Sequence, residues 1–182
     1  MSGSSGAVYG VRVLEVLNAR YPDIETHLIV SDAAKRTIEY ELDRPSHSVE
    51  HLASVVHREG DVAAAIASGT FVTDGMVVAP CSIRTLSAIA TSHSNSLLTR
   101  AADVCLKERR RLVLVVRETP LHLNHLRLMV QVTEAGAIVA PPCPGFYHRP
   151  RTLDSAIDHT VVKVLDLLGF HPDDLIERWT GL

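Results

Sequence analysis

Short apolar runs alternate with longer segments of helical periodicity, and this alternation limits the folds open to the chain more than any other feature. Four runs are rich in apolar and β-branched residues: Thr26–Val30, Met76–Pro80, Leu112–Val116 and Ala137–Pro141. Because these runs are nearly continuous, they are typical of strands buried on both faces. Strands separated by helices pair in parallel, so the sequence predicts an α/β fold with a helix-covered parallel sheet.

Helical spacing of apolar residues is strongest at the two ends of the chain. It runs through Tyr9, Val13, Val16 and Leu17 in the first helix and through Ile157, Val161, Val164, Leu165 and Leu168 in the last. Gly169 suits the C-terminal cap of the last helix. Residues 44–72 are the least regular part, with weak helical signals.

Length and charge exclude several classes of protein. The 182 residues are 46% hydrophobic and carry a net charge of −3, so we expect one domain over residues 1–182 and no nucleic-acid binding. No apolar run reaches the ~18 residues of a membrane helix, and no signal peptide follows Met1. The three cysteines lie far apart, which favours reduced thiols in a cytoplasmic protein.

Polar and small residues gather directly after the predicted strands. Ser31 follows the first run, Cys81–Thr85 the second, Arg117–Pro120 the third and Pro141–Pro150 the fourth. Ligands of open parallel sheets bind beyond the carboxyl ends of the strands, so a binding site is expected there. Taken singly, these residues have simpler interpretations: helix caps for the serines, a surface ion pair for Arg117 and Glu118, and core packing for Tyr147.

The stretch "GSSGA" (Gly3–Ala7) opens the first helix. Small residues let the backbone approach a ligand, and a helix N-terminus offers free N–H donors to a phosphate. By itself this stretch is also compatible with a Gly/Ser linker.

Two histidine patterns resemble metal sites. "HSVEH" (His47–His51) matches a zinc-peptidase motif, and "HLNH" (His122–His125) places two histidines on one helical face. A zinc site needs a third ligand and a well-supported helix, so we predict no metal at either place.

In combination, these segments resemble the UbiX-type flavin prenyltransferases. The similarity runs from "SGSSGAVYGVRVLEVL" through "HLIVSDAAKRTIEYE", "GMVVAPCSIRTLSAIA", "LLTRAADVCLKERRRLVLVVRETPLHLNHLRLM" and "GAIVAPPCPGFYHRP" to "RW" at Arg178–Trp179. The family resemblance implies a flavodoxin-like, three-layer fold and makes "GSSGA" a flavin loop. The family has an apolar strand before this loop, and Met1 falls near the end of that strand. The first strand is therefore expected to be missing from this chain.

The resemblance implies a reaction without a metal, in which a dimethylallyl group passes from dimethylallyl phosphate to N5 and C6 of reduced FMN. The prenylated FMN then serves a UbiD-type decarboxylase. By the same resemblance, FMN is bound by Gly3, Ser4, Ser5, Ser31, Ser82, Ile83, Arg84, Thr85 and Arg117. The prenyl phosphate and its surroundings are contacted by Arg100, Lys107, Tyr147, Lys163 and Trp179, and the catalytic residues are Ser5, Glu41 and Glu118.

Family members form homododecamers with sites at subunit contacts, so some of these residues are expected to act from a neighbouring chain. Related sequences often have arginine at Lys163; lysine keeps the charge but loses the bidentate geometry. Two other functions stay open from the sequence. One is a flavin-dependent cysteine decarboxylase, and the other is an FMN-binding accessory subunit of a hydroxyarylic-acid decarboxylase.

Overall fold

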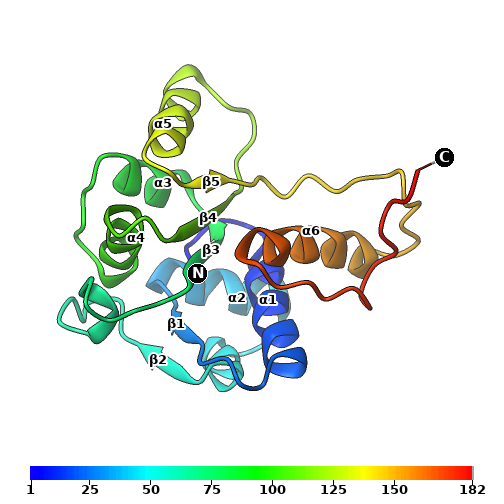
Figure 1. The fold of residues 1–182 in the computed structure, drawn as a ribbon, viewed down its shortest axis with the longest axis horizontal. Helices are drawn as coiled ribbons and strands as arrows, with labels where there is room; N and C mark the ends of the chain where they lie inside the picture. Colours follow the sequence, from blue (N-terminus) through cyan, green and yellow to red (C-terminus); the bar gives the residue numbers. More distant parts are fainter. Residues whose placement is uncertain (182) are drawn as a thin grey trace.

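The chain folds into three layers, with strands between two groups of helices (Figure 1). The computed structural model describes residues 1–181. The helices are α1 (Ala7–Arg20), α2 (Asp32–Leu42), α3 (Ile83–Ala90), α4 (Leu97–Lys107), α5 (Leu123–Glu134) and α6 (Leu153–Leu168), with 3₁₀ helices η1 (Ser46–Leu52) and η2 (Ala65–Ala67). The strands are β1 (His27–Ile29), β2 (Val55–His57), β3 (Gly75–Cys81), β4 (Arg111–Val116) and β5 (Ile138–Val139).

All strand pairs are parallel, as the sequence predicts, but they form two sheets. One sheet has the order β1-β2 and the other has the order β3-β4-β5. Alternate residues of β4 point to opposite faces. Leu112 and Leu114 pack with residues of α3 and α4, while Val113 and Val115 pack with residues of α1 and α6. Burial on both faces explains why the run in β4 is apolar throughout.

The first two residues lie between the two sheets and bond to both. The Met1 ammonium donates to the carbonyl oxygen of Ile29 at 2.6 Å, and the Met1 carbonyl oxygen accepts from Ser31 N at 3.1 Å. On the other side, Ser2 N donates to the carbonyl oxygen of Pro80 at 3.1 Å. Met1 and Ser2 therefore occupy the end of a strand position between β1 and β3.

Beyond these two residues the strand position is an apolar cavity of about 420 Å³. Its walls include Leu28 of β1, Val77 of β3 and Leu14 of α1. Helix α1 lies close to β3 because Gly10 has no side chain: a Cβ there would lie 2.1 Å from the carbonyl oxygen of Ala79. The cavity lies between the two sheets, where the family's first strand was expected to pair.

The four strands predicted from the sequence are confirmed, with ends shifted by one or two residues. Strand β2 was not predicted, because it has three residues inside the irregular segment 44–72 and Val56 is exposed. Gly169 caps α6 with a φ of 96°, a left-handed conformation that favours glycine. In residues 1–181, no helix combines the length and the apolar character that crossing a membrane requires.

The buried terminus leads to a prediction about pH. Burial lowers the pKa of the Met1 ammonium from 8.0 to about 6. Between these values the unfolded chain binds more protons than the folded chain, so the stability of the 182-residue chain should rise with pH. The expected rise from pH 6 to pH 8 is about 2 kcal/mol, measured by urea unfolding.

Adding about six to eight apolar residues before Met1 should fill the cavity and replace the ammonium with an amide. The extended chain is then expected to unfold at higher urea concentration, and this part of the pH dependence should disappear. Identical midpoints and identical pH profiles for the two chains would contradict the assignment of the cavity as a strand position.

Candidate functional site

A cavity of about 1040 Å³ lies beyond the carboxyl ends of three strands. Ser31 follows β1, Arg58 follows β2 and Ser82 follows β3, and all three residues line it. Its volume is at the upper end of the range usual for small-molecule sites. The cavity therefore lies where the sequence predicts a ligand.

Three helices begin at this cavity, each with a serine cap that lines it. In α2, Ser31 Oγ accepts a hydrogen bond from Ala34 N at 3.1 Å. In α3, Ser82 Oγ accepts from Thr85 N at 3.3 Å. In α4, Ser96 Oγ accepts from Thr99 N at 3.4 Å. A helix N-terminus carries a partial positive charge and unpaired N–H groups. Three of them around one cavity favour an anionic ligand such as a phosphate.

The charged side chains around the cavity add up to a net positive charge. The cations are Lys35, Arg36, Arg58 and Arg84, and the anions are Asp32, Glu50 and Glu59. Two of the anions have partners within the protein. Asp32 Oδ1 lies 3.1 Å from Lys35 Nζ, and Glu59 Oε2 accepts from Asp32 N at 3.2 Å. The four cations outnumber the three anions, which again favours an anion.

The glycine–serine loop before α1 forms one wall of the cavity through Gly3. A Cβ on Gly3 would lie 2.3 Å from the Cβ of Ala33, so this approach to α2 requires glycine. Ser2 Oγ fixes the loop to the end of β3, because it donates to the carbonyl oxygen of Pro80 at 3.0 Å and accepts from Ser82 N at 2.8 Å. Ser4 Oγ is buried and has no hydrogen-bond partner among residues 1–181, which leaves it free for a ligand.

Glu41 of α2 holds the other end of this loop. Its carboxylate accepts from Gly6 N at 2.9 Å and from Ala7 N at 2.9 Å, at the N-terminus of α1. Gly6 has a φ of 95°, so the chain turns into α1 in a conformation that favours glycine. The α1 N-terminus is thus neutralised by a protein carboxylate.

His57 brings a neutral polar group to the cavity wall. Its Nε2 lies 2.9 Å from Nδ1 of His27, and Nε2 of His27 lies 2.7 Å from Oε1 of Glu25. Burial, and then the neighbouring His27, lower the pKa of His57 and so favour its uncharged form.

Five residues expected to bind the cofactor line this cavity together: Gly3, Ser31, Ser82, Arg84 and Thr85. Of the other four, Ile83 is the first residue of α3, Ser4 and Ser5 continue the loop, and Arg117 lies beyond β4. Arg117 N donates to the carbonyl oxygen of Cys81 at 3.1 Å, so Arg117 is next to Ser82. Glu118 is exposed beside it, with Oε1 accepting from Thr119 N at 3.0 Å.

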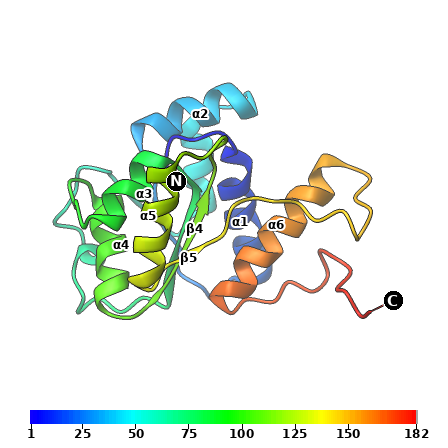
Figure 2. The same cartoon turned by 90° about the horizontal axis from the view of Figure 1, so that it is seen from above.

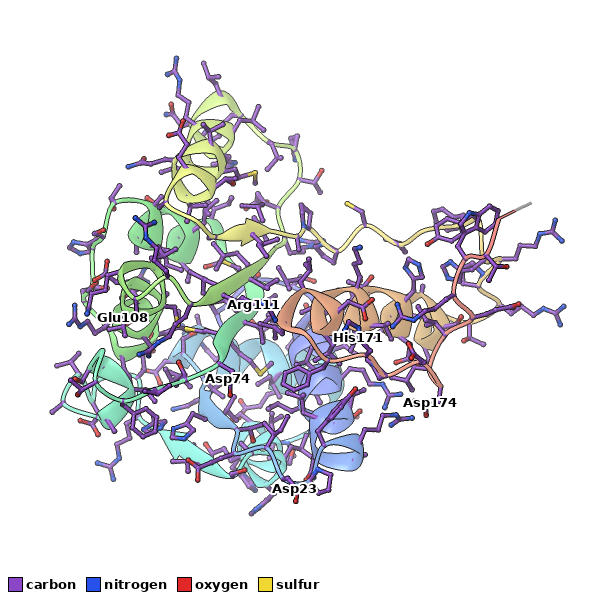
Figure 3. All side chains as sticks on the ribbon, in the orientation of Figure 1. Asp23, Asp74, Glu108, Arg111, His171 and Asp174 are labelled. Carbon is purple, nitrogen blue, oxygen red and sulfur yellow. The ribbon has the colours of Figure 1, made fainter. Side chains whose placement is uncertain are left out.

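The residues expected at the prenyl phosphate fall into two groups that the single chain does not bring together. Arg100 and Lys107 lie on α4, which packs against one face of the β3-β4-β5 sheet. Lys163 lies on α6, which packs against the opposite face. Figure 3 shows Glu108, the residue after Lys107, on the far side of the molecule from His171, which follows α6.

Tyr147 and Trp179 belong to a projection that we call the arm: residues 141–152 and 172–181, which extend along α6 and past its N-terminal end (Figures 1 and 2). Both rings are 58% exposed, and their centroids lie 5.6 Å apart, edge to face. The arm therefore presents aromatic groups away from the three-layer body.

The contribution of α4 to the cavity was not predicted from the sequence. Asn95, Ser96 and Thr99 line it, and Ser96 and Thr99 form a reciprocal capping box. The signal is present in the sequence as a serine three residues before a threonine, at the start of an apolar helix. Arg58 and His57 were missed because β2 was not recognised.

Comparisons with known proteins agree with this geometry. The flavoprotein family model matches residues 1–147. The flavin prenyltransferase UbiX of Thauera aromatica is 58% identical over 181 residues, covering 100% of this chain and 92% of the relative.

Two solved structures are similar over the whole chain. The structure of AnUbiX (PadA1) in complex with FMN and dimethylallyl pyrophosphate has a TM-score of 0.96 and 47% identity, covering 100% of this chain and 95% of the other. A dodecameric FMN-dependent UbiX-like decarboxylase from Escherichia coli O157:H7 has a TM-score of 0.94 and 44% identity, covering 100% of both chains.

The role of Glu41 at the loop can be tested by substitution. Glu41→Ala removes both acceptors from the first N–H groups of α1, which should cost about 1–2 kcal/mol, the usual effect of losing a helix cap. In a chain of this length the thermal midpoint should fall by a few degrees. Glu134→Ala, at an exposed position of α5, is the control. Equal midpoints for the two variants would show that the Glu41 contacts contribute nothing to stability.

Proposed function

This chain belongs to the flavin prenyltransferases of the flavoprotein family, and from that membership we propose that it transfers a dimethylallyl group from dimethylallyl phosphate to reduced FMN. The observation that carries the proposal is the cavity at the strand ends, where three serine-capped helix N-termini and four cations surround space for a nucleotide. A relative of 47% identity has been solved with FMN and dimethylallyl pyrophosphate.

FMN is the acceptor substrate, and it supplies the nucleophilic N5 and C6 positions. We assign its binding to the loop Gly3–Ser5, to Ser31, to Ser82–Thr85 and to Arg117. The residues fit the group: the helix N-termini and Arg84 suit its phosphate, and the buried hydroxyl of Ser4 lacks a partner that a polar ligand would supply.

Breaking the bond between the prenyl carbon and the phosphate oxygen puts negative charge on the departing phosphate. Cations and hydroxyl donors stabilise this charge. We assign this role to Arg100, Lys107, Tyr147 and Lys163, with Trp179 beside them. Because α4 and α6 lie on opposite faces of the sheet, a complete phosphate site requires a second copy of the chain. A homo-oligomer, a dodecamer as in the E. coli relative, is part of the proposal.

The catalytic residues of the proposal are Ser5, Glu41 and Glu118, with proton transfer assigned to Glu118 and Ser5 as its relay. Glu118 is exposed beside Arg117, where it can exchange a proton with solvent and with a ligand at the strand ends. Glu41 reaches the site through the loop, since its carboxylate binds the backbone that follows Ser5. In this proposal residues 1–182 act as one domain in the cytoplasm, without a metal, and a UbiD-type decarboxylase receives the prenylated FMN.

The decisive experiment incubates the protein with reduced FMN and dimethylallyl phosphate under anaerobic conditions and follows the mass of the flavin. We expect a gain equal to one dimethylallyl group less one hydrogen, because the group replaces a proton of the flavin, with release of one phosphate. Bound FMN of unchanged mass would contradict the proposal and support an accessory flavin-binding subunit. Decarboxylation of a cysteine-containing peptide in place of prenyl transfer would support a cysteine decarboxylase.

A further inference from the structure

Two histidines with no assigned role lie against Tyr147 in the arm. His148 follows Tyr147, and His159 lies on α6. The imidazole rings of His148 and His159 stack with centroids 4.2 Å apart and planes 7° apart. Nε2 of His159 lies 2.9 Å from the hydroxyl of Tyr147. The approach is close because residue 145 is glycine: a Cβ there would lie 2.8 Å from the Tyr147 ring and 3.3 Å from the His159 ring.

His148 has unused hydrogen-bonding capacity. Both of its ring nitrogens are buried, and neither has a hydrogen-bond partner among the described residues. An unpaired buried polar group costs free energy comparable to a lost hydrogen bond, about 1–3 kcal/mol. Such groups are normally satisfied, so these two nitrogens point to a ligand with acceptor oxygens.

The charges around His159 explain why an anion would change its protonation. Lys163 lies one turn further along α6, on the same face. Burial first, and then His148 and Lys163, lower the pKa of His159. Tyr147 also belongs to this cluster, through its hydrogen bond to His159. Trp179 of the arm joins the cluster through its ring contact with Tyr147. Asp158, the adjacent acid on α6, is paired with Arg12 of α1 at 2.7 Å. The acid next to His159 in the sequence is therefore already engaged by a cation.

The hydroxyl of Tyr147 links protonation to ligand binding. When Nε2 of His159 carries no proton, the hydroxyl donates to it and cannot donate elsewhere. When Nε2 is protonated, it donates to the phenol oxygen, and the phenol proton becomes free for a ligand. A dianion would also cancel the repulsion between the stacked rings and Lys163.

Binding of a phosphate by Tyr147 and Lys163 belongs to the proposed function; we propose further that the stacked His148 and His159 couple this site to protonation, so that one proton is taken up from solvent when a dianion binds. The identification of the natural ligand as the prenyl phosphate rests on the proposed function. The proton uptake itself rests on the stacked rings, the unpartnered nitrogens and the Tyr147 contact. In this arrangement His159 is a positioning residue, because it acts through the hydroxyl of Tyr147.

The test measures binding of sulfate to the FMN-loaded protein by calorimetry from pH 6 to pH 8. Sulfate remains a dianion over this range, so any pH dependence comes from the protein. With one linked proton, the dissociation constant should rise by up to about tenfold per pH unit above the range where His159 titrates. Calorimetry in two buffers with different ionisation enthalpies should report about one proton taken up per sulfate.

Three variants locate the effect. His159→Gln keeps a hydrogen-bonding side chain beside Tyr147 but cannot become charged, so proton uptake should fall to near zero while weaker binding persists. Lys163→Gln should weaken binding at every pH, which places the sulfate at this cluster. His47→Gln, at an exposed position of η1, should behave as the parent protein does.

Proton uptake that persists unchanged in His159→Gln, or sulfate binding that is unaffected by Lys163→Gln, would overturn the proposal. So would binding that does not depend on pH in the parent protein, even if that protein prenylates FMN. Sulfate-linked proton uptake in a protein that does not prenylate FMN would instead contradict the proposed function and leave the anion site standing.

Discussion

The hydrogen bonds of Met1 and Ser2 are the contacts on which the rest of the site depends. They join Ile29 and Ser31 on one sheet to Pro80 on the other, across a position where the two sheets share no strand. Ser2 Oγ then binds the end of β3 and Glu41 holds the start of α1, so the loop between them has both ends fixed. This short connection sets the distance between the serine caps that follow β1 and β3.

Much of the fold could be predicted because burial leaves a clear pattern. Strand β4 is apolar on both faces, and Gly169 ends α6 in the conformation that glycine favours. Strand β2 could not be recognised, because three residues with an exposed Val56 carry no burial pattern. Of the expected flavin contacts, Ser31 and Ser82, which come just after β1 and β3, line the cavity. Ser96 was missed because it follows a loop and not a strand.

The residues assigned to the prenyl phosphate show a second limit of prediction from the sequence. Lys107 and Lys163 can be assigned to one ligand by resemblance, yet periodicity places them on helices that cover opposite faces of the sheet. If both lysines bind one phosphate, as we propose, they come from two chains. The exposed Tyr147 and Trp179 of the arm are then available for contact with the second chain. In the proposed function, the cavity at the strand ends is formed by one chain and the leaving-group site is shared between two.

Mixing two inactive variants tests this account most directly. Lys107→Gln and Lys163→Gln are each expected to transfer the prenyl group poorly as pure oligomers. If the two lysines of one site come from different chains, co-assembled variants will contain some sites with both lysines intact, and transfer should recover to a sizeable fraction of the parent rate. Recovery confined to mixed oligomers is the predicted result. Mixed oligomers no more active than either pure variant would contradict the shared site.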